Sequence, residues 1–215
     1  MHQTKIVKIE HDREKTAKIL DQCANIIKKG GVIAFPTETS YGLGCDATNP
    51  EAIKKIYEIK GRDENNPLPI IVGDVHMAEE YCILSEKAIK LVRAFMPGPL
   101  TLIVKKKKDK LPEELSPAEK GVAFRIPAKE FARIMVQEAG VPVVSTSANL
   151  SGKSPIYKIE ELKATFNGKV DIIIDGGDLP PIRPSTIIDL CKEPPVVVRE
   201  GPLNSKDVLH ELNEQ

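Results

Sequence analysis

The chain has 215 residues and a formal net charge of zero, because 31 Lys and Arg residues balance 31 Asp and Glu residues. This balance excludes a histone-like or polybasic protein. A hydrophobic content of 41% is enough for a sizeable core, which argues against intrinsic disorder. The chain has four Tyr, five Phe and no Trp, which disfavours an RNA-binding surface built on stacked aromatic rings.

The first half of the chain shows short apolar runs alternating with helical periodicity. It predicts, in order, a strand at 4–9, a helix over 17–27, a strand at 32–35, a polar loop at 36–44, a helix over 50–60, a strand at 68–72 and two helices after 74 and 85. Gly30 and Gly61 end the first two helices, while Asn49, Asp74 and Ser85 are the expected N-caps.

The second half continues this alternation. It predicts strands at 100–104, 122–126, 141–145, 170–174, 186–190 and 196–199, and helices at 128–138, 158–166 and 205–212. Some strands are separated by helices and others only by loops, so mixed parallel and antiparallel pairing is expected. The sequence therefore predicts one α/β domain over residues 1–215, built on one twisted mixed sheet flanked by helices.

The cysteines and the N-terminal segment indicate a reducing compartment. Cys23, Cys45, Cys82 and Cys191 form no C-x-x-C pair, and no His stands at ligand spacing, so no structural metal site is expected. The N-terminal segment is charged where a signal peptide is apolar, and no apolar run reaches membrane-spanning length. A soluble, cytoplasmic protein without a membrane partner is expected.

A polar segment at 147–154 resembles a P-loop only in part. It ends in Gly152-Lys153-Ser154, but Ser147 stands where a P-loop has its first Gly, and Pro155 follows at once. The segment fits either a hydrogen-bonded turn or a polar binding loop at the end of a strand.

Four basic residues could each have either a structural role or a role in binding an anion. Lys60 and Arg62 flank Gly61 at a helix end, where they could stabilise the helix dipole or grip a phosphate chain. Arg125 and Arg199 end apolar strands, which suggests either an anion-binding cleft or ordinary pairing with carboxylates. The lysine-rich run at 105–110 fits a solvated loop better than an RNA contact.

Taken together, several motifs resemble the YrdC family of threonylcarbamoyl-AMP synthases in order and spacing, most strongly over residues 15–205. They are FPTETSYGL at 35–43, IKGR at 59–62, NPL at 66–68, PGPLT at 97–101, RIP at 125–127, TSANLSG at 146–152, STIID at 185–189 and REG at 199–201. The resemblance implies a concave, positively charged cleft on the mixed sheet. It corresponds to the family's short, single-domain form.

The resemblance also implies an activity. It predicts a nucleotidyltransferase that joins L-threonine, bicarbonate and ATP into L-threonylcarbamoyladenylate and pyrophosphate, with Mg²⁺ bound mainly through the ATP phosphates. The product would supply tRNA threonylcarbamoyl-transferase machinery, and tRNA or double-stranded RNA is a further possible partner. The alternative is a tRNA-binding or double-stranded RNA-binding module without synthase activity, against which the zero net charge counts.

By resemblance, the functional residues fall into three overlapping groups. The family's catalytic tetrad corresponds to Lys60, Arg62, Ser147 and Asn149. Threonine-binding positions correspond to Thr39, Arg125, Ser147 and Ser185. ATP-binding positions correspond to Arg62, Asn66, Asn149 and Arg199. The chain departs from many relatives at Ser40, where they have Val, and at Ile71 and Val72, near which some relatives have a His.

Overall fold

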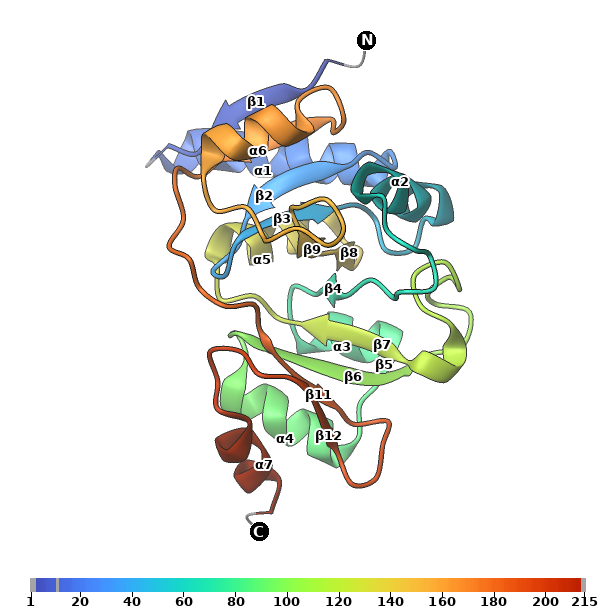
Figure 1. The fold of residues 1–215 in the computed structure, drawn as a ribbon. Helices are drawn as coiled ribbons and strands as arrows, with labels where there is room; N and C mark the ends of the chain where they lie inside the picture. Colours follow the sequence, from blue (N-terminus) through green and yellow to red (C-terminus); the bar gives the residue numbers. More distant parts are fainter. Residues whose placement is uncertain (1–2, 11, 214–215) are drawn as a thin grey trace.

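The computed structural model describes residues 3–10 and 12–213, and its strands form two sheets (Figure 1). The first sheet, in the upper half of Figure 1, has the order β1 (Lys5–Lys8), β10 (Ile172–Asp175), β2 (Ile33–Pro36), β3 (Tyr41–Gly44) and β9 (Thr146–Ser147). The strands β1, β10 and β2 run parallel, whereas β3 is antiparallel to both of its neighbours. This confirms the predicted mixed pairing.

The second sheet is also mixed. Its order is β12 (Val196–Arg199), β11 (Thr186–Asp189), β6 (Leu100–Lys106), β7 (Val122–Arg125), β4 (Ile70–Ile71) and β8 (Val143–Val144), and β5 (Cys82–Ile83) pairs with β6. The prediction of one sheet is therefore wrong. The chain changes from one sheet to the other at Ser145, which separates β8 in the second sheet from β9 in the first. One short segment therefore contributes a strand to each sheet.

Helices pack around the two sheets. They are α1 (Arg13–Lys28), α2 (Pro50–Lys60), α3 (Val75–Tyr81), α4 (Glu86–Phe95), α5 (Glu130–Ala139), α6 (Ile159–Phe166) and α7 (Ser205–Asn213), with a short 3₁₀ turn at Ala118–Lys120. The helices α1 and α5 share an apolar cluster with β2 and β10, whereas α4 packs against α7 beside the second sheet (Figure 1). No helix among residues 3–10 and 12–213 combines the length and apolar character needed to span a bilayer.

The strands β2 and β10 are continuous apolar runs because each is buried on both faces. Ile33 and Phe35 belong to the cluster under α1 and α5, whereas Ala34 points to the larger cluster on the other face. Ile172 and Ile173 divide in the same way. A strand that is buried on both faces needs apolar residues at every position.

The loop predicted at 36–44 is shorter than expected, because its second half forms β3. Small and polar residues are typical of loops, but a glycine in a strand also permits close approach of a neighbouring backbone. A Cβ on Gly44 would lie 2.6 Å from the Val144 carbonyl oxygen and 2.8 Å from the Phe35 ring. Gly44 therefore lets the first sheet approach β8 of the second.

The helix α2 begins and ends as its sequence predicts. The Asn49 side chain accepts hydrogen bonds from the backbone N–H groups of Glu51 and Ala52, and Gly61 ends the helix in the left-handed conformation at φ 58°. Such a φ is natural for glycine and costly for other residues. The turn at Gly61 places Lys60 and Arg62 beside the segment that follows β9.

Candidate functional site

A cavity of about 350 Å³ lies between the two sheets. Residues of β3 and β9 from the first sheet line it together with residues of β4, β6, β7, β11 and β12 from the second. Its lining is rich in hydroxyl groups, and the charged residues among the described lining are three arginines, Arg62, Arg125 and Arg199. Such a wall can bind anions by charge and by directed hydrogen bonds.

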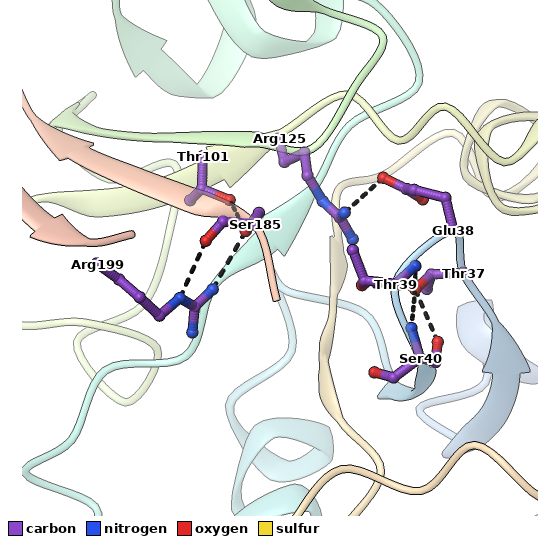
Figure 2. Close-up of polar contacts among 8 residues, drawn as sticks. All are labelled: Thr37, Glu38, Thr39, Ser40, Thr101, Arg125, Ser185 and Arg199. Atoms are coloured by element: carbon purple, nitrogen blue, oxygen red, sulfur yellow. Dashed lines mark hydrogen bonds and ion pairs between the residues drawn. The ribbon is translucent and has the colours of Figure 1, made fainter. Parts of the chain in front are cut away.

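The loop between β2 and β3 forms one rim of the cavity. The Thr37 hydroxyl donates to the Ser40 carbonyl at 2.7 Å and accepts from the backbone N–H groups of Thr39 and Ser40. The hydroxyls of Thr37 and Thr39 lie 3.1 Å apart. This network, shown on the right of Figure 2, fixes the loop that carries Thr37, Thr39 and Ser40, and all three residues line the cavity.

Arg125 enters the cavity from the end of β7 and is 7% exposed. Its Nη1 lies 2.5 Å from Glu38 Oε1, so Glu38 reaches from the β2–β3 loop to the second sheet (Figure 2). Burial lowers the pKa of the Arg125 guanidinium, and the Glu38 carboxylate opposes this effect. An arginine remains charged under these conditions and keeps N–H groups for a ligand.

Arg199 occupies the other side of the same wall. Its Nε donates to the Ser185 carbonyl at 3.0 Å and its Nη2 to the Ser185 hydroxyl at 3.2 Å, as Figure 2 shows. The Thr101 hydroxyl lies 2.7 Å from that of Ser185. Partial burial lowers the pKa of Arg199, and the nearby charge of Arg125 lowers it further.

Arg62 follows the Gly61 turn and is held by the chain just beyond it. Its Nε donates to the Asn66 carbonyl at 3.2 Å and its Nη2 to the Pro67 carbonyl at 3.1 Å. Arg62 lines the cavity, whereas Asn66 stands outside the lining and contributes its backbone carbonyl.

Lys60 is buried behind the cavity with 2% exposure. Its Nζ donates to the carbonyls of Ser147 and Asn149, at 2.5 and 2.9 Å, and to Asn149 Oδ1 at 3.1 Å. An ammonium group has three N–H donors, so these contacts use all of them. Burial lowers the pKa of Lys60 to about 8, and the charge of Arg62 contributes.

The Asn149 side chain is equally occupied. Its Oδ1 accepts from Lys60 and from the Ser147 hydroxyl at 2.5 Å, and its Nδ2 donates to the carbonyls of Leu150 and Lys153. The backbone N–H of Ser151 also donates to the Lys60 carbonyl. Lys60 and Asn149 therefore hold the segment 147–153 against the end of α2.

The predicted site residues divide into two groups. Six of the nine line the cavity, namely Thr39, Arg62, Arg125, Ser147, Ser185 and Arg199. The other three, Lys60, Asn66 and Asn149, lie outside the lining. Both groups are neighbours in space, although their members come from distant parts of the chain.

Two other expectations have clear structural outcomes. The segment after Gly152 does not open a helix, since α6 begins at Ile159, so the P-loop interpretation is wrong. The lysine-rich run at 105–110 is a loop only from residue 107, because β6 includes Lys106. Lys106 donates to three backbone carbonyls and to Glu113, while Lys110 pairs with Glu80.

Sequence reasoning missed two site residues. Glu38 lies between two hydroxyl residues of the 35–43 motif, but its partner Arg125 is 87 residues away. Thr101 ends the 97–101 motif and pairs with Ser185, 84 residues away. Both stood within motifs already noted, and only tertiary structure shows their partners.

Comparisons with known proteins found relatives over most of the chain. The Sua5–YciO–YrdC family model, described as "Telomere recombination", matches residues 25–201. The threonylcarbamoyl-AMP synthase of Bacillus subtilis strain 168 is 38% identical over 188 residues, which are 87% of this chain and 54% of that protein. A putative threonylcarbamoyl-AMP synthase of Methanocaldococcus jannaschii is 36% identical over 198 residues, or 92% and 93% of the two chains.

A solved structure shows the same fold. It is Pyrococcus abyssi Sua5 complexed with L-threonine, with a TM-score of 0.87 and 35% identity, covering 97% of this chain and 60% of that one. The chain spans about half the length of the Bacillus subtilis and Pyrococcus abyssi synthases that it matches in sequence. It spans nearly all of the Methanocaldococcus protein.

Proposed function

The chain belongs to the Sua5–YciO–YrdC family, and on that premise we propose that it is a threonylcarbamoyl-AMP synthase. In this reaction L-threonine, bicarbonate and ATP give L-threonylcarbamoyladenylate and pyrophosphate, which makes the protein a nucleotidyltransferase. The observation that carries the proposal is the cavity between the sheets, where three arginines and several hydroxyls line one space. Relatives that bear the synthase name and a neighbour complexed with L-threonine support it.

The chemistry requires residue types that this cavity offers. The threonine amine and bicarbonate first form a carbamate, whose oxygen attacks the α-phosphorus of ATP and expels pyrophosphate. Catalysis of such a transfer is mostly positioning and neutralisation of charge, so a side-chain nucleophile is not needed. Arg62 and Arg199 would neutralise the phosphates, and Arg125 would hold the threonine carboxylate.

The hydroxyl groups would determine which amino acid is accepted. Thr39, Ser147 and Ser185 line the cavity and can bond the hydroxyl of threonine. A site built for that hydroxyl would reject an apolar isostere, because its own polar groups would be left unpaired.

Two residues of the predicted catalytic tetrad would contact the ligand, and the other two would position the loop that contacts it. Arg62 and Ser147 line the cavity and can touch a ligand. Lys60 and Asn149 would act through the segment 147–153 that they hold, and Asn66 through its carbonyl contact with Arg62. We therefore propose Lys60 and Asn149 as positioning residues for this reaction.

Mg²⁺ would arrive with ATP as part of the substrate. Among the described residues no group of three or more His, Cys, Asp or Glu side chains is placed to hold a metal ion. The residues therefore do not fit a protein-built Mg²⁺ site, and Mg²⁺ commonly binds substrate phosphates with few protein ligands.

The product suggests the protein's place in the cell. A threonylcarbamoyl adenylate would supply a tRNA-modifying transferase, and the modified base would be N6-threonylcarbamoyladenosine. We place this reaction in the cytoplasm, within one YrdC-like domain. Direct contact with tRNA or double-stranded RNA is a further proposal that the synthase activity does not require.

The proposal is tested by measuring pyrophosphate release from ATP with threonine and bicarbonate together and with each omitted in turn. Mass spectrometry should identify threonylcarbamoyl-AMP only in the complete mixture. Arg62→Ala should abolish release, whereas Lys153→Ala should behave as the wild type because its side chain lies outside the cavity. Release that is indifferent to threonine would contradict the proposal.

A further inference from the structure

The cavity carries its charge unevenly. Arg125 is paired with Glu38, so that end of the cavity is neutral in sum. Arg62 and Arg199 donate to carbonyl and hydroxyl oxygens, and no carboxylate among the described residues lies within ion-pair distance of either. Arg62 and Arg199 therefore bring two uncompensated positive charges to the cavity lining.

Glu38 also has one carboxylate oxygen that accepts no hydrogen bond. Its Oε1 binds Arg125, whereas Oε2 is the one buried side-chain oxygen or nitrogen in the described part of the chain that has no hydrogen-bond partner. Burying a carboxylate oxygen without a donor is unfavourable, because its lost hydration is not replaced. A donor supplied by a ligand would remove this cost.

Glu38 borders the cavity, although it is not itself part of the lining. Its chain neighbours Thr37 and Thr39 line the cavity, and so does its partner Arg125. Figure 2 shows the Glu38 side chain running from the β2–β3 loop alongside the Arg125 guanidinium. Glu38 and Arg125 thus place a negative and a positive group side by side at one end of the cavity.

We propose that Glu38 makes this end of the cavity select a zwitterionic α-amino acid over an anion. Arg125 takes the carboxylate of the amino acid, and the α-ammonium group lies on the Glu38 side. An α-amino acid carries these opposite charges on two groups bonded to the same carbon, which matches the neighbouring Arg125 and Glu38. This inference rests on the proposed function and adds a residue that determines its specificity.

The same carboxylate keeps the two substrates apart. A polyphosphate is repelled by Glu38 and attracted by Arg62 and Arg199, so it binds at these two arginines and not at the Arg125–Glu38 pair. Without Glu38, three arginines would compete for one polyanion. Glu38 thereby reserves Arg125 for the amino acid and leaves Arg62 and Arg199 to the polyphosphate.

The test compares two ligands that differ only in the α-substituent. They are L-threonine and 2,3-dihydroxybutanoate of the same configuration, in which a hydroxyl replaces the ammonium group. Isothermal titration calorimetry measures both affinities for the wild type, for Glu38→Gln, which keeps an oxygen for Arg125, and for Glu51→Gln. Glu51 pairs with Lys54 on the outer side of α2 and serves as the matched control.

The wild type and Glu51→Gln should bind threonine at least about 10-fold more tightly than the dihydroxy acid, as expected for one charge-assisted hydrogen bond. In Glu38→Gln this preference should fall by about 10-fold, with the affinity for the dihydroxy acid unchanged or higher. A preference that persists in Glu38→Gln overturns the proposal. An equal loss for both ligands also overturns it, because it assigns Glu38 only the orientation of Arg125.

Two further outcomes separate this inference from the proposed function. The wild-type preference is measured without any substitution, so its absence overturns the inference even where Glu38→Gln fails to fold. Binding of other α-amino acids that depends on Glu38, without adenylate formation from threonine, contradicts the synthase and retains the zwitterion site. Adenylate formation with an unaltered preference in Glu38→Gln contradicts the inference alone.

Discussion

The two walls of the cavity differ in how their polar groups are satisfied. The closed wall presents Ser147 to the cavity and is supported from behind by Lys60 and the rest of the segment 147–153. There the Lys60 and Asn149 side chains use their donors and acceptors on each other and on nearby backbone. The open wall consists of Arg125, Ser185 and Arg199, which line the cavity with guanidinium and hydroxyl groups. A motif residue can thus serve the site by building it or by facing the ligand.

The distinction has an energetic consequence. Removal of a buried, fully bonded group disturbs the folded state, because its former partners lose their hydrogen bonds inside the protein. Removal of a group that faces a cavity mainly weakens ligand binding and changes stability little. Substitutions in the closed wall should therefore lower both stability and activity, and those at Arg199 should lower activity with little loss of stability.

Lys60→Met should give the largest effect. It deletes three hydrogen bonds that hold the segment 147–153, so the free energy of unfolding should fall by about 2 kcal/mol, part of the loss being offset because no charge is buried. Displacement of Ser147 should slow pyrophosphate release by about 100-fold or more. Urea unfolding and steady-state kinetics measure the two effects.

The matched control for that change is Lys55→Met on the same helix. Lys55 donates one hydrogen bond to the Gly30 carbonyl, on a loop that does not line the cavity. Its activity should match that of the wild type. Equal loss of activity in the two variants would show that the closed wall has no special role.

Arg199→Ala should leave the fold nearly intact and weaken ATP binding. The change removes two hydrogen bonds that Arg199, a residue partly open to solvent, donates to Ser185, which should cost about 1 kcal/mol of stability or less. The KM for ATP should rise by about 30-fold, with the KM for threonine much less affected. Arg93→Ala on α4 controls for loss of an arginine, and a larger change in the threonine KM would assign Arg199 to the amino acid.

The pH dependence should separate the stability of the closed wall from its function. The pKa of Lys60 is lowered from 10.5 to about 8, first by burial and then by Arg62. Between these two values the unfolded chain holds a proton that the folded chain has lost, so this group raises the free energy of unfolding as pH rises.

Activity should move in the opposite direction over the same range. A neutral amine has one N–H fewer for the three acceptors that Lys60 binds, so the rate should fall above pH 8, approaching about 10-fold per pH unit. Steady-state rates of pyrophosphate release and urea midpoints of unfolding, both measured at pH 7.5 and 9.5, test these two expectations. A rate that is constant to pH 9.5 would show that the charge on Lys60 is not required.

Local signals made much of the fold predictable. Asn49 and Gly61 bound α2 as the sequence predicts, and the long apolar runs are strands. The predictions failed where pairing depended on distant residues. The strands β5 and β9 are two residues long and have no periodicity of their own, and Gly42 and Gly44 in β3 imitate a loop.

The sequence predicted some members of the cavity lining but not their arrangement. The motifs shared with the family pointed to six of the residues that line the cavity, and missed Thr101. The sequence could not show that Lys60 and Asn149 are bound to each other, because they lie 89 residues apart. For the same reason it could not assign Glu38 to Arg125. Hydrogen-bond partners of buried polar groups are set by tertiary contacts, which no local pattern encodes.

The smallest effect is expected at Ser40, where many relatives have Val. The Ser40 hydroxyl donates one hydrogen bond, to the Tyr41 carbonyl at 3.2 Å, whereas the Thr37 hydroxyl takes part in four. Ser40→Val should therefore change stability by about 1 kcal/mol or less and the KM for threonine by about 3-fold or less. Thr37→Val should cost about 2 kcal/mol, because the β2–β3 loop is built on its hydroxyl. Equal costs for the two variants would mean that the loop is held by its strands alone, and the rim of the cavity would then owe its shape to the first sheet.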